Sequence, residues 1–240
     1  MFRRAILIIH GYAGGTYDEE YLANFLELNH NFDVFTFTLP GHESKNSKVT
    51  KEDWIKSVEE HTEMLIKNNY KNIYVIGHSM GGVLATYVAI KYKEVKKLVL
   101  LAPAFKYLAL DENGNFNLIK GIKKSPSLIK NYSKEEVISR IMKVPFKSVN
   151  EFVNLVKMFE EIPKDIQIPT LIIQGLDDDI VPIDSSKYVY NLIPHNNKKI
   201  LFFENTNHDI FRSEKKEEIS IIIRDFLKRW QLWQNFNFTF

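Results

Sequence analysis

The chain has 240 residues, of which 45% are hydrophobic and 26% are charged, a balance typical of a soluble globular protein rather than a disordered one. Lys and Arg number 32 against 30 Asp and Glu, so the net charge of +2 is too small for binding to a phosphate backbone, and we expect no nucleic-acid partner. The sequence contains no cysteine, which excludes a disulfide framework, a thiolate nucleophile and a cysteine-ligated metal centre.

Two arginines precede the first apolar run, residues 5–9, in an arrangement similar to the start of a signal peptide. The run ends at Ile9, short of the roughly 7 to 15 apolar residues of a secretory core and of the about 20 of a membrane span. We therefore expect a cytoplasmic protein with no stable membrane insertion.

Short runs rich in β-branched residues and bounded by turn residues predict buried parallel strands. These runs occupy residues 5–9, 34–38, 73–76, 98–101, 170–174 and 199–203. Helical patterns lie between most of them, at residues 50–69, 80–92, 184–193 and 213–230. Thr50 and Asp53 have the spacing of a capping box at the start of the first of these helices. The alternation predicts an α/β fold, with an about six-stranded, mostly parallel sheet and helices on both faces.

The alternation of strands and helices stops between Pro103 and Pro169, where only helical patterns occur. We interpret residues 105–165 as a helical cap inserted into a core formed by residues 1–104 and 166–230. An ordinary pair of surface helices is the alternative.

Apolar side chains of the predicted cap have two interpretations. Phe146, Phe152, Val156 and Phe159 would line a pocket for an acyl chain, or they would only pack the cap onto the sheet. The uncharged, aromatic-rich tail at residues 231–240 also leaves two alternatives open. It is either a frayed terminus or a segment that packs on a neighbouring chain in a homo-oligomer.

The strongest local signal is the sequence Gly77-His78-Ser79-Met80-Gly81, a G-x-S-x-G pattern between a predicted strand and a predicted helix. Glycines on both sides of the serine remove side chains that would collide across a sharp strand-to-helix turn. The turn lifts Ser79 out of the sheet, and the N–H groups at the start of the helix favour negative charge beside it. We interpret Ser79 as a nucleophile rather than as a simple helix N-cap.

A serine nucleophile requires a histidine base and a carboxylate that orients the histidine. His208 follows the last predicted strand, in a loop at the carboxyl edge of the sheet, where catalytic groups gather. Asp177, Asp178 and Asp179 follow the preceding strand, and one of them would orient His208. Adjacent carboxylates diverge and no histidine lies close to them in the sequence, so we expect no metal.

The glycine-rich segment at residues 10–15 follows the first predicted strand. It would bring a backbone N–H up to the serine as part of an oxyanion hole. The segment lacks the G-K-[ST] and G-x-G-x-x-G spacings of phosphate-binding loops, and we expect no cofactor.

Over nearly its whole length the chain resembles the α/β-hydrolase superfamily, and more narrowly the bacterial carboxylesterases and monoacylglycerol lipases with a small helical cap. The matching segments are the His10-Gly11 loop, Leu39-Pro40-Gly41-His42, residues 77–81 and the run ending Ile168-Pro169-Thr170. The order of serine, aspartate and histidine along the chain is also that of the superfamily.

The resemblance implies roles for individual residues. It makes Asp178 the acid, with Asp177 as the second choice. It assigns the oxyanion donors to the backbone N–H groups of Tyr12 and Met80. It also implies a packing role for His78.

These residues predict a serine hydrolase that cleaves small-molecule carboxylic esters of small to medium or long acyl chains through an acyl-enzyme. Two alternatives remain open. The same fold and residues could cleave an amide or a C–C bond, because the fold does not fix the scissile bond. The protein could also be a hydrolase-like module that binds a ligand without turnover.

Overall fold

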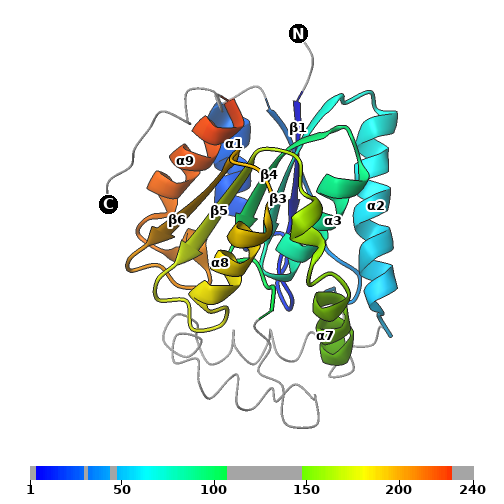
Figure 1. The fold of residues 1–240 in the computed structure, drawn as a ribbon. Coiled ribbons are helices and arrows are strands. Elements are labelled where there is room, and N and C mark those ends of the chain that lie inside the picture. The colour runs from blue at the N-terminus through cyan, green and yellow to red at the C-terminus, as the bar shows by residue number, and fades with distance from the viewer. Residues whose placement is uncertain (1–3, 30–31, 44–47, 107–147, 229–240) are drawn as a thin grey trace.

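The computed structural model describes residues 4–29, 32–43, 48–106 and 148–228 (Figure 1). Its centre is a six-stranded sheet. The strands are β1 (Arg4–Ile9), β2 (Phe32–Thr36), β3 (Asn72–His78), β4 (Val95–Leu101), β5 (Thr170–Gly175) and β6 (Lys198–Phe203). Their order is β2-β1-β3-β4-β5-β6, and every neighbouring pair is parallel. The predicted α/β class and six-stranded sheet are confirmed.

Helices cover both faces of the sheet, as predicted (Figure 1). They are α1 (Glu20–Asn29), α2 (Lys51–Lys67), α3 (Met80–Lys91), α7 (Ser148–Met158), α8 (Ile183–Leu192) and α9 (Lys216–Lys228). On one face, α1 and α9 bury their apolar side chains against the sheet, and α2, α3 and α8 do so on the other. The predicted capping box is present, because Thr50 Oγ1 accepts from the Asp53 N–H while the Asp53 carboxylate accepts from the Thr50 N–H.

One helix and the ends of several elements differ from the sequence prediction; β4, for example, begins at Val95 rather than at residue 98. The helix α1 was not predicted, because Leu22 and Leu26 are its only fully buried apolar residues and give a weak helical pattern. The strand β2 lies two positions earlier than predicted, since it is an edge strand whose pairing with β1 runs from Arg4–Phe32 to Ile8–Thr36. Edge strands are half exposed and their ends carry a weaker apolar signal.

Part of the predicted cap, residues 107–147 with Phe146, lies outside the described residues. The described part contains α7 and a short 3₁₀ helix, Ile162–Asp165. The helix α7 contacts α2 and α3, and it buries Phe152 and Val156 in the same apolar cluster as Trp54 of α2. No helix within the described ranges combines the length and the apolar character that a membrane span requires.

The turn from β3 into α3 depends on unusually close backbone contacts. A Cβ added to Gly81 would lie 2.1 Å from the Ile9 carbonyl oxygen. One added to the adjacent Gly82 would lie 3.1 Å from the Pro103 side chain. Of these two contacts, only the one at Gly81 cannot form without a movement of the backbone. The strand β1 and the helix α3 can therefore approach this closely only when residue 81 is glycine.

We expect Gly81→Ala to lower the free energy of unfolding by about 3 kcal/mol or more, because β1 must move away from α3. Gly82→Ala is the matched control. It introduces the same methyl group one position later in the same helix, and its effect should stay within about 1 kcal/mol. Urea unfolding of both variants makes the comparison. Equal losses would show that the close approach at Gly81 is not the constraint.

Candidate active site

Ser79 sits in the turn between β3 and α3 with a backbone conformation of φ 54° and ψ −117°. This positive φ is strained for a residue with a side chain and persists only when surrounding contacts impose it. Three backbone hydrogen bonds do so. The Ser79 N–H donates to the Leu101 carbonyl at 2.9 Å, and its own carbonyl accepts from Gly82 and Ala104 at 3.0 and 3.1 Å. The strain places the Ser79 side chain at the carboxyl end of the sheet.

The loop after β1 lies directly against Ser79. A Cβ on Gly11 would be 3.0 Å from Ser79 Cβ and 3.7 Å from its Oγ. The next residue, Tyr12, has a backbone N–H with no hydrogen bond to any described part of the chain. Met80 is the first residue of α3, where an N–H has no acceptor inside the helix. Two amide groups that could receive a developing negative charge therefore flank the serine.

His10 fixes the conformation of this loop. Its Nδ1 lies 2.8 Å from the Gly11 carbonyl oxygen, to which it donates, and its Nε2 accepts from the Leu39 N–H at 2.9 Å. These two bonds require a neutral ring with the proton on Nδ1. Burial, together with the neighbouring His42, lowers the pKa of His10 to about 3. The loop is thus tied to the segment after β2 by an uncharged histidine.

The side chain of Tyr12 joins the same loop to α7. Its ring stacks on Phe152 with a centroid distance of 5.0 Å and an interplanar angle of 12°. Its hydroxyl hydrogen-bonds to Ser148 Oγ at 2.8 Å. Phe159, just beyond α7, stacks on Tyr87 of α3. In the described part of the predicted cap, the aromatic side chains of Phe152 and Phe159 therefore pack against the rest of the molecule.

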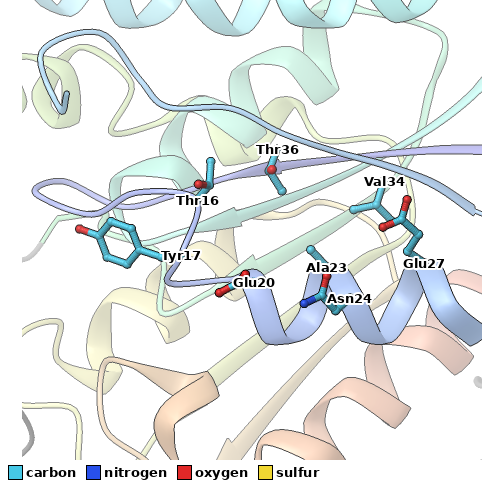
Figure 2. Close-up of a pocket in the computed structure, with 8 residues that line it drawn as sticks. All are labelled: Thr16, Tyr17, Glu20, Ala23, Asn24, Glu27, Val34 and Thr36. Atoms are coloured by element: carbon cyan, nitrogen blue, oxygen red, sulfur yellow. The ribbon is translucent and has the colours of Figure 1, made fainter.

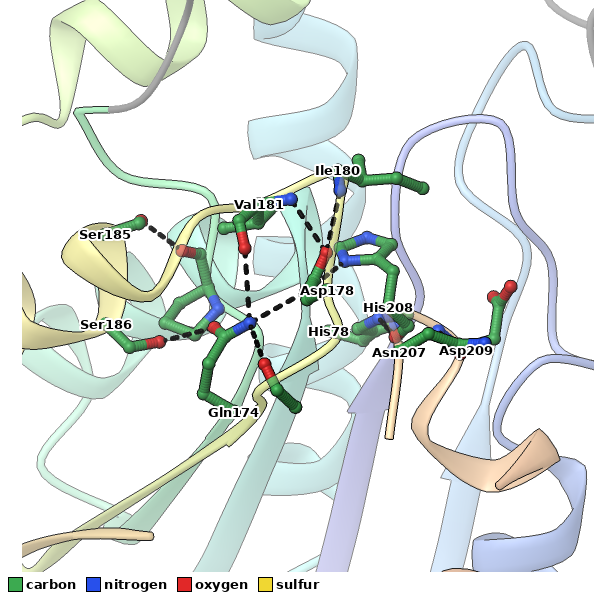
Figure 3. Close-up of polar contacts among 12 residues, drawn as sticks. His78, Gln174, Asp178, Ile180, Val181, Ser185, Ser186, Asn207, His208 and Asp209 are labelled. Atoms are coloured by element: carbon green, nitrogen blue, oxygen red, sulfur yellow. Dashed lines mark hydrogen bonds and ion pairs between the residues drawn. The ribbon is translucent and has the colours of Figure 1, made fainter. Parts of the chain in front are cut away.

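The loops after β5 and β6 bring Asp178 and His208 together (Figure 3). His208 Nδ1 lies 2.9 Å from Asp178 Oδ2, and the Asp178 side chain is fully buried. The other carboxylate oxygen accepts from the N–H groups of Ile180 and Val181 at 2.9 and 2.8 Å. Burial alone would raise the pKa of Asp178, but His208 and these N–H donors hold that pKa below its usual value. Asp178 is therefore an ionised acceptor for the His208 ring.

Gln174 orients Asp178 in turn, a contact that the sequence analysis missed. Its Nε2 donates to Asp178 Oδ2 at 2.8 Å, and its Oε1 accepts from Ser186 of α8 at 2.8 Å (Figure 3). Gln174 lies inside a strand, where a single amide among apolar residues has no distinguishing sequence pattern. The one signal in the sequence is a polar residue directly after the apolar run of β5. In the structure, Gln174 is fully buried.

Asp177, the alternative acid, is exposed, and in the described chain the carboxylate that pairs with His208 is that of Asp178. Its N–H donates to the Thr206 carbonyl at 3.1 Å, which turns its side chain outward and the next one, Asp178, inward. Across the described ranges, no group of three or more His, Asp or Glu side chains is arranged to hold a metal ion.

His78, at the end of β3 and next to Ser79, connects His208 to the turn between β3 and α3. The His208 carbonyl accepts from His78 Nε2 at 3.0 Å, and the two rings lie 4.8 Å apart between centroids. In the described chain, no hydrogen bond joins His208 to Ser79 Oγ. Such bonds are often long in structures without substrate and tighten in the complex.

A separate cavity of about 270 Å³ lies between α1, β2 and the loop before α1 (Figure 2). It is lined by Thr16, Tyr17, Glu20, Ala23, Asn24, Glu27, Val34 and Thr36. None of the candidate catalytic residues belongs to this lining, so the cavity is distinct from the serine site.

Comparisons with known proteins show which family the chain matches. The chain matches the family described as serine aminopeptidase, S33, over residues 2–216. It is 23% identical over 239 residues to a carboxylesterase of Bacillus subtilis (strain 168), a match that covers 94% of this chain and 93% of the relative. It is 26% identical over 208 residues to a thermostable monoacylglycerol lipase of Bacillus sp. (strain H-257), covering 85% and 82%.

A solved structure is similar as well. The monoacylglycerol lipase of Paleococcus ferrophilus matches with a TM-score of 0.73 and 18% identity, over 95% of each chain. At this identity the likeness establishes the fold, and the α/β-hydrolase architecture that the sequence predicted is confirmed.

The neutral state of His10 generates a prediction about stability and pH. Its pKa in the folded chain is about 3, against 6.5 for an exposed histidine, so only the unfolded chain gains a proton between these values. The contribution of His10 to stability should therefore fall as the pH drops from about 6.5 towards 3, by up to about 1.4 kcal/mol per pH unit.

His10→Gln should accordingly be less stable than the wild type at pH 7.5, and this difference should shrink as the pH falls to 5. Urea unfolding at several pH values measures the difference. Thr62→Val is the matched control, because it removes the buried hydrogen bond from Thr62 to the Val58 carbonyl and no titratable group. The difference in free energy of unfolding between the wild type and His10→Gln could instead be as independent of pH as the difference for Thr62→Val. That result would contradict the assignment of a neutral His10.

Proposed function

Because the chain belongs to the serine aminopeptidase S33 family of α/β-hydrolases, we propose that it hydrolyses small-molecule carboxylic esters with Ser79, His208 and Asp178 as its catalytic residues. The observation that carries the proposal is the buried 2.9 Å contact between His208 and Asp178, next to a serine held in a strained strand-to-helix turn. A nucleophile, a base and a group that orients the base are the three parts that acyl transfer requires.

In the proposed reaction, His208 takes the Ser79 proton as Oγ attacks the ester carbonyl. The negative charge that develops on the carbonyl oxygen is received by the N–H groups of Tyr12 and Met80. The protonated His208 then donates to the leaving alcohol, and Asp178 stabilises the positive charge on the ring during this step. Water repeats the sequence on the acyl-enzyme and releases the acid.

One consideration favours esters over other scissile bonds. Relatives that match most of this chain are named a carboxylesterase and a monoacylglycerol lipase. The family description includes aminopeptidases, so amides must be tested beside esters.

The proposed function predicts that the protein hydrolyses p-nitrophenyl esters. Turnover is measured for esters from acetate to palmitate, with aminoacyl p-nitroanilides as the amide substrates. Ser79→Ala should reduce turnover of the esters by about 10⁶, and a second loss of His208 should add little, because the residues act as a unit. An optimum at eight carbons or longer would support an apolar acyl pocket, since each buried CH₂ contributes about 0.8 kcal/mol.

Other outcomes of that panel decide between the alternatives. An optimum at acetate would contradict the acyl pocket while leaving the serine mechanism intact. Cleavage of the anilides alone would replace ester by amide hydrolysis. Ester hydrolysis indifferent to Ser79, or no turnover of any substrate, would overturn the proposed function.

A second prediction separates the two candidate acids. Asp178→Asn should lower kcat by about 10⁴, because an amide in place of the carboxylate favours the wrong His208 tautomer. Asp177→Asn makes the same chemical change one residue earlier, on an exposed side chain, and kcat should stay within about twofold of the wild type. Steady-state kinetics on the best ester measures both, and a larger loss in Asp177→Asn would reverse the assignment.

A further inference from the structure

His78, the residue before the candidate nucleophile, is in contact with a buried carboxylate. Its Nδ1 lies 2.8 Å from Glu19 Oε1, and its Nε2 lies 3.0 Å from the carbonyl oxygen of His208. The side chains of His78 and Glu19 are only 9% and 2% exposed. Glu19 comes from the loop before α1, so the pair links this loop, the end of β3 and the loop that carries His208.

These contacts determine how many protons the pair holds. A carbonyl oxygen can only accept, so His78 Nε2 carries a proton and donates it to His208. The other ring nitrogen faces a carboxylate, which also only accepts unless it is protonated. A second proton must therefore lie between Nδ1 of His78 and Oε1 of Glu19.

The electrostatic surroundings keep this second proton in place at neutral pH. Burial opposes the charge of the His78 ring, but the hydrogen bond to Glu19 and the carboxylates of Glu19, Asp209 and Asp18 raise the pKa of His78 to about 9. Burial also raises the pKa of Glu19. Two further titratable rings of the described chain lie near His78, those of His208 and His10. The raised pKa of His78 and the raised pKa of Glu19 both favour retention of one shared proton by the pair.

We propose that Glu19 and His78 form a proton-sharing pair that positions His208. The inference rests on the proposed function, in which His208 is the general base. The hydrogen bond from His78 fixes the backbone of His208. Glu19 holds the His78 ring from the opposite nitrogen, so that Nε2 stays directed at the His208 carbonyl oxygen.

A purely stabilising role is a poor explanation for the pair. A buried ion pair adds little net stability compared with apolar residues of similar volume, because both charges lose their hydration. What the pair supplies and apolar residues cannot is a donor for the His208 carbonyl. Glu19 and His78 are thus positioning residues, and they need not touch the substrate.

Glu19→Gln separates charge from geometry. Its amide N–H can donate to Nδ1 of a neutral His78, whose Nε2 still donates to His208, so the hydrogen bonds remain while the shared proton and both charges disappear. We expect kcat and KM both to stay within about threefold of the wild type, because the hydrogen bonds that hold the His208 backbone are kept.

Glu19→Ala tests the positioning itself. Without a partner on Nδ1, the His78 ring is free to turn and release the His208 carbonyl. We expect kcat to fall by about 10 to 100-fold while KM changes by less than about threefold. Thr62→Val, which loses a buried hydrogen bond on α2, is the control for destabilisation alone and should leave kcat unchanged.

Histidine ring ¹⁵N NMR of the full chain measures the protonation of the His78 ring nitrogens without any substrate. The signals are assigned with His78→Gln and His208→Gln. The proposal expects both nitrogens of His78 to be protonated at pH 7.5 in the wild type and only Nε2 in Glu19→Gln. A neutral His78 in the wild type, or a Glu19→Ala variant with the kcat of the wild type, would overturn it. If the wild type cleaves no ester, the proposed function fails, and the NMR result still decides the pair.

Discussion

The glycines that flank Ser79 allow three backbone segments to approach more closely than side chains would permit. A Cβ on Gly77 would lie 2.3 Å from the Gly81 carbonyl oxygen, and one on Gly81 would lie 2.1 Å from that of Ile9. This contact fixes β1, β3 and α3 relative to one another and leaves Ser79 in its strained turn with Gly11 against it. The arrangement of Ser79, the candidate nucleophile, and the neighbouring amides follows from backbone packing, before any polar side chain contributes.

The second half of the site depends on a similar contact. A Cβ on Gly175, at the end of β5, would lie 2.1 Å from the Thr206 carbonyl oxygen, so the loops after β5 and β6 are pressed together. The hydrogen bond from the Asp177 N–H to Thr206 then sets which aspartate faces His208. All strands are parallel, so these loops and those after β1 and β3 lie at one edge of the sheet. In our proposal, Glu19 and His78 join the two halves.

Much of the fold and the order of the site residues could be predicted from the sequence, because buried parallel strands and a G-x-S-x-G turn leave strong local patterns. The helix α1 was missed because only Leu22 and Leu26 are fully buried on it. Glu19 could not be recognised, since it lies in an acidic segment that looks like a solvated turn and its partner His78 is 59 positions away. The choice of Asp178 over Asp177 needed the resemblance, because the hydrogen bond that orients the loop has no sequence signature.

Covalent labelling with a fluorophosphonate, followed by peptide mass spectrometry, tests the central assignment most directly. A serine activated by His208 should give a single adduct on Ser79, and the labelling rate should fall by several powers of ten in His208→Gln while the fold is retained. An adduct on another residue, or a rate at Ser79 that is the same with and without His208, would contradict the assignment of these residues as nucleophile and base.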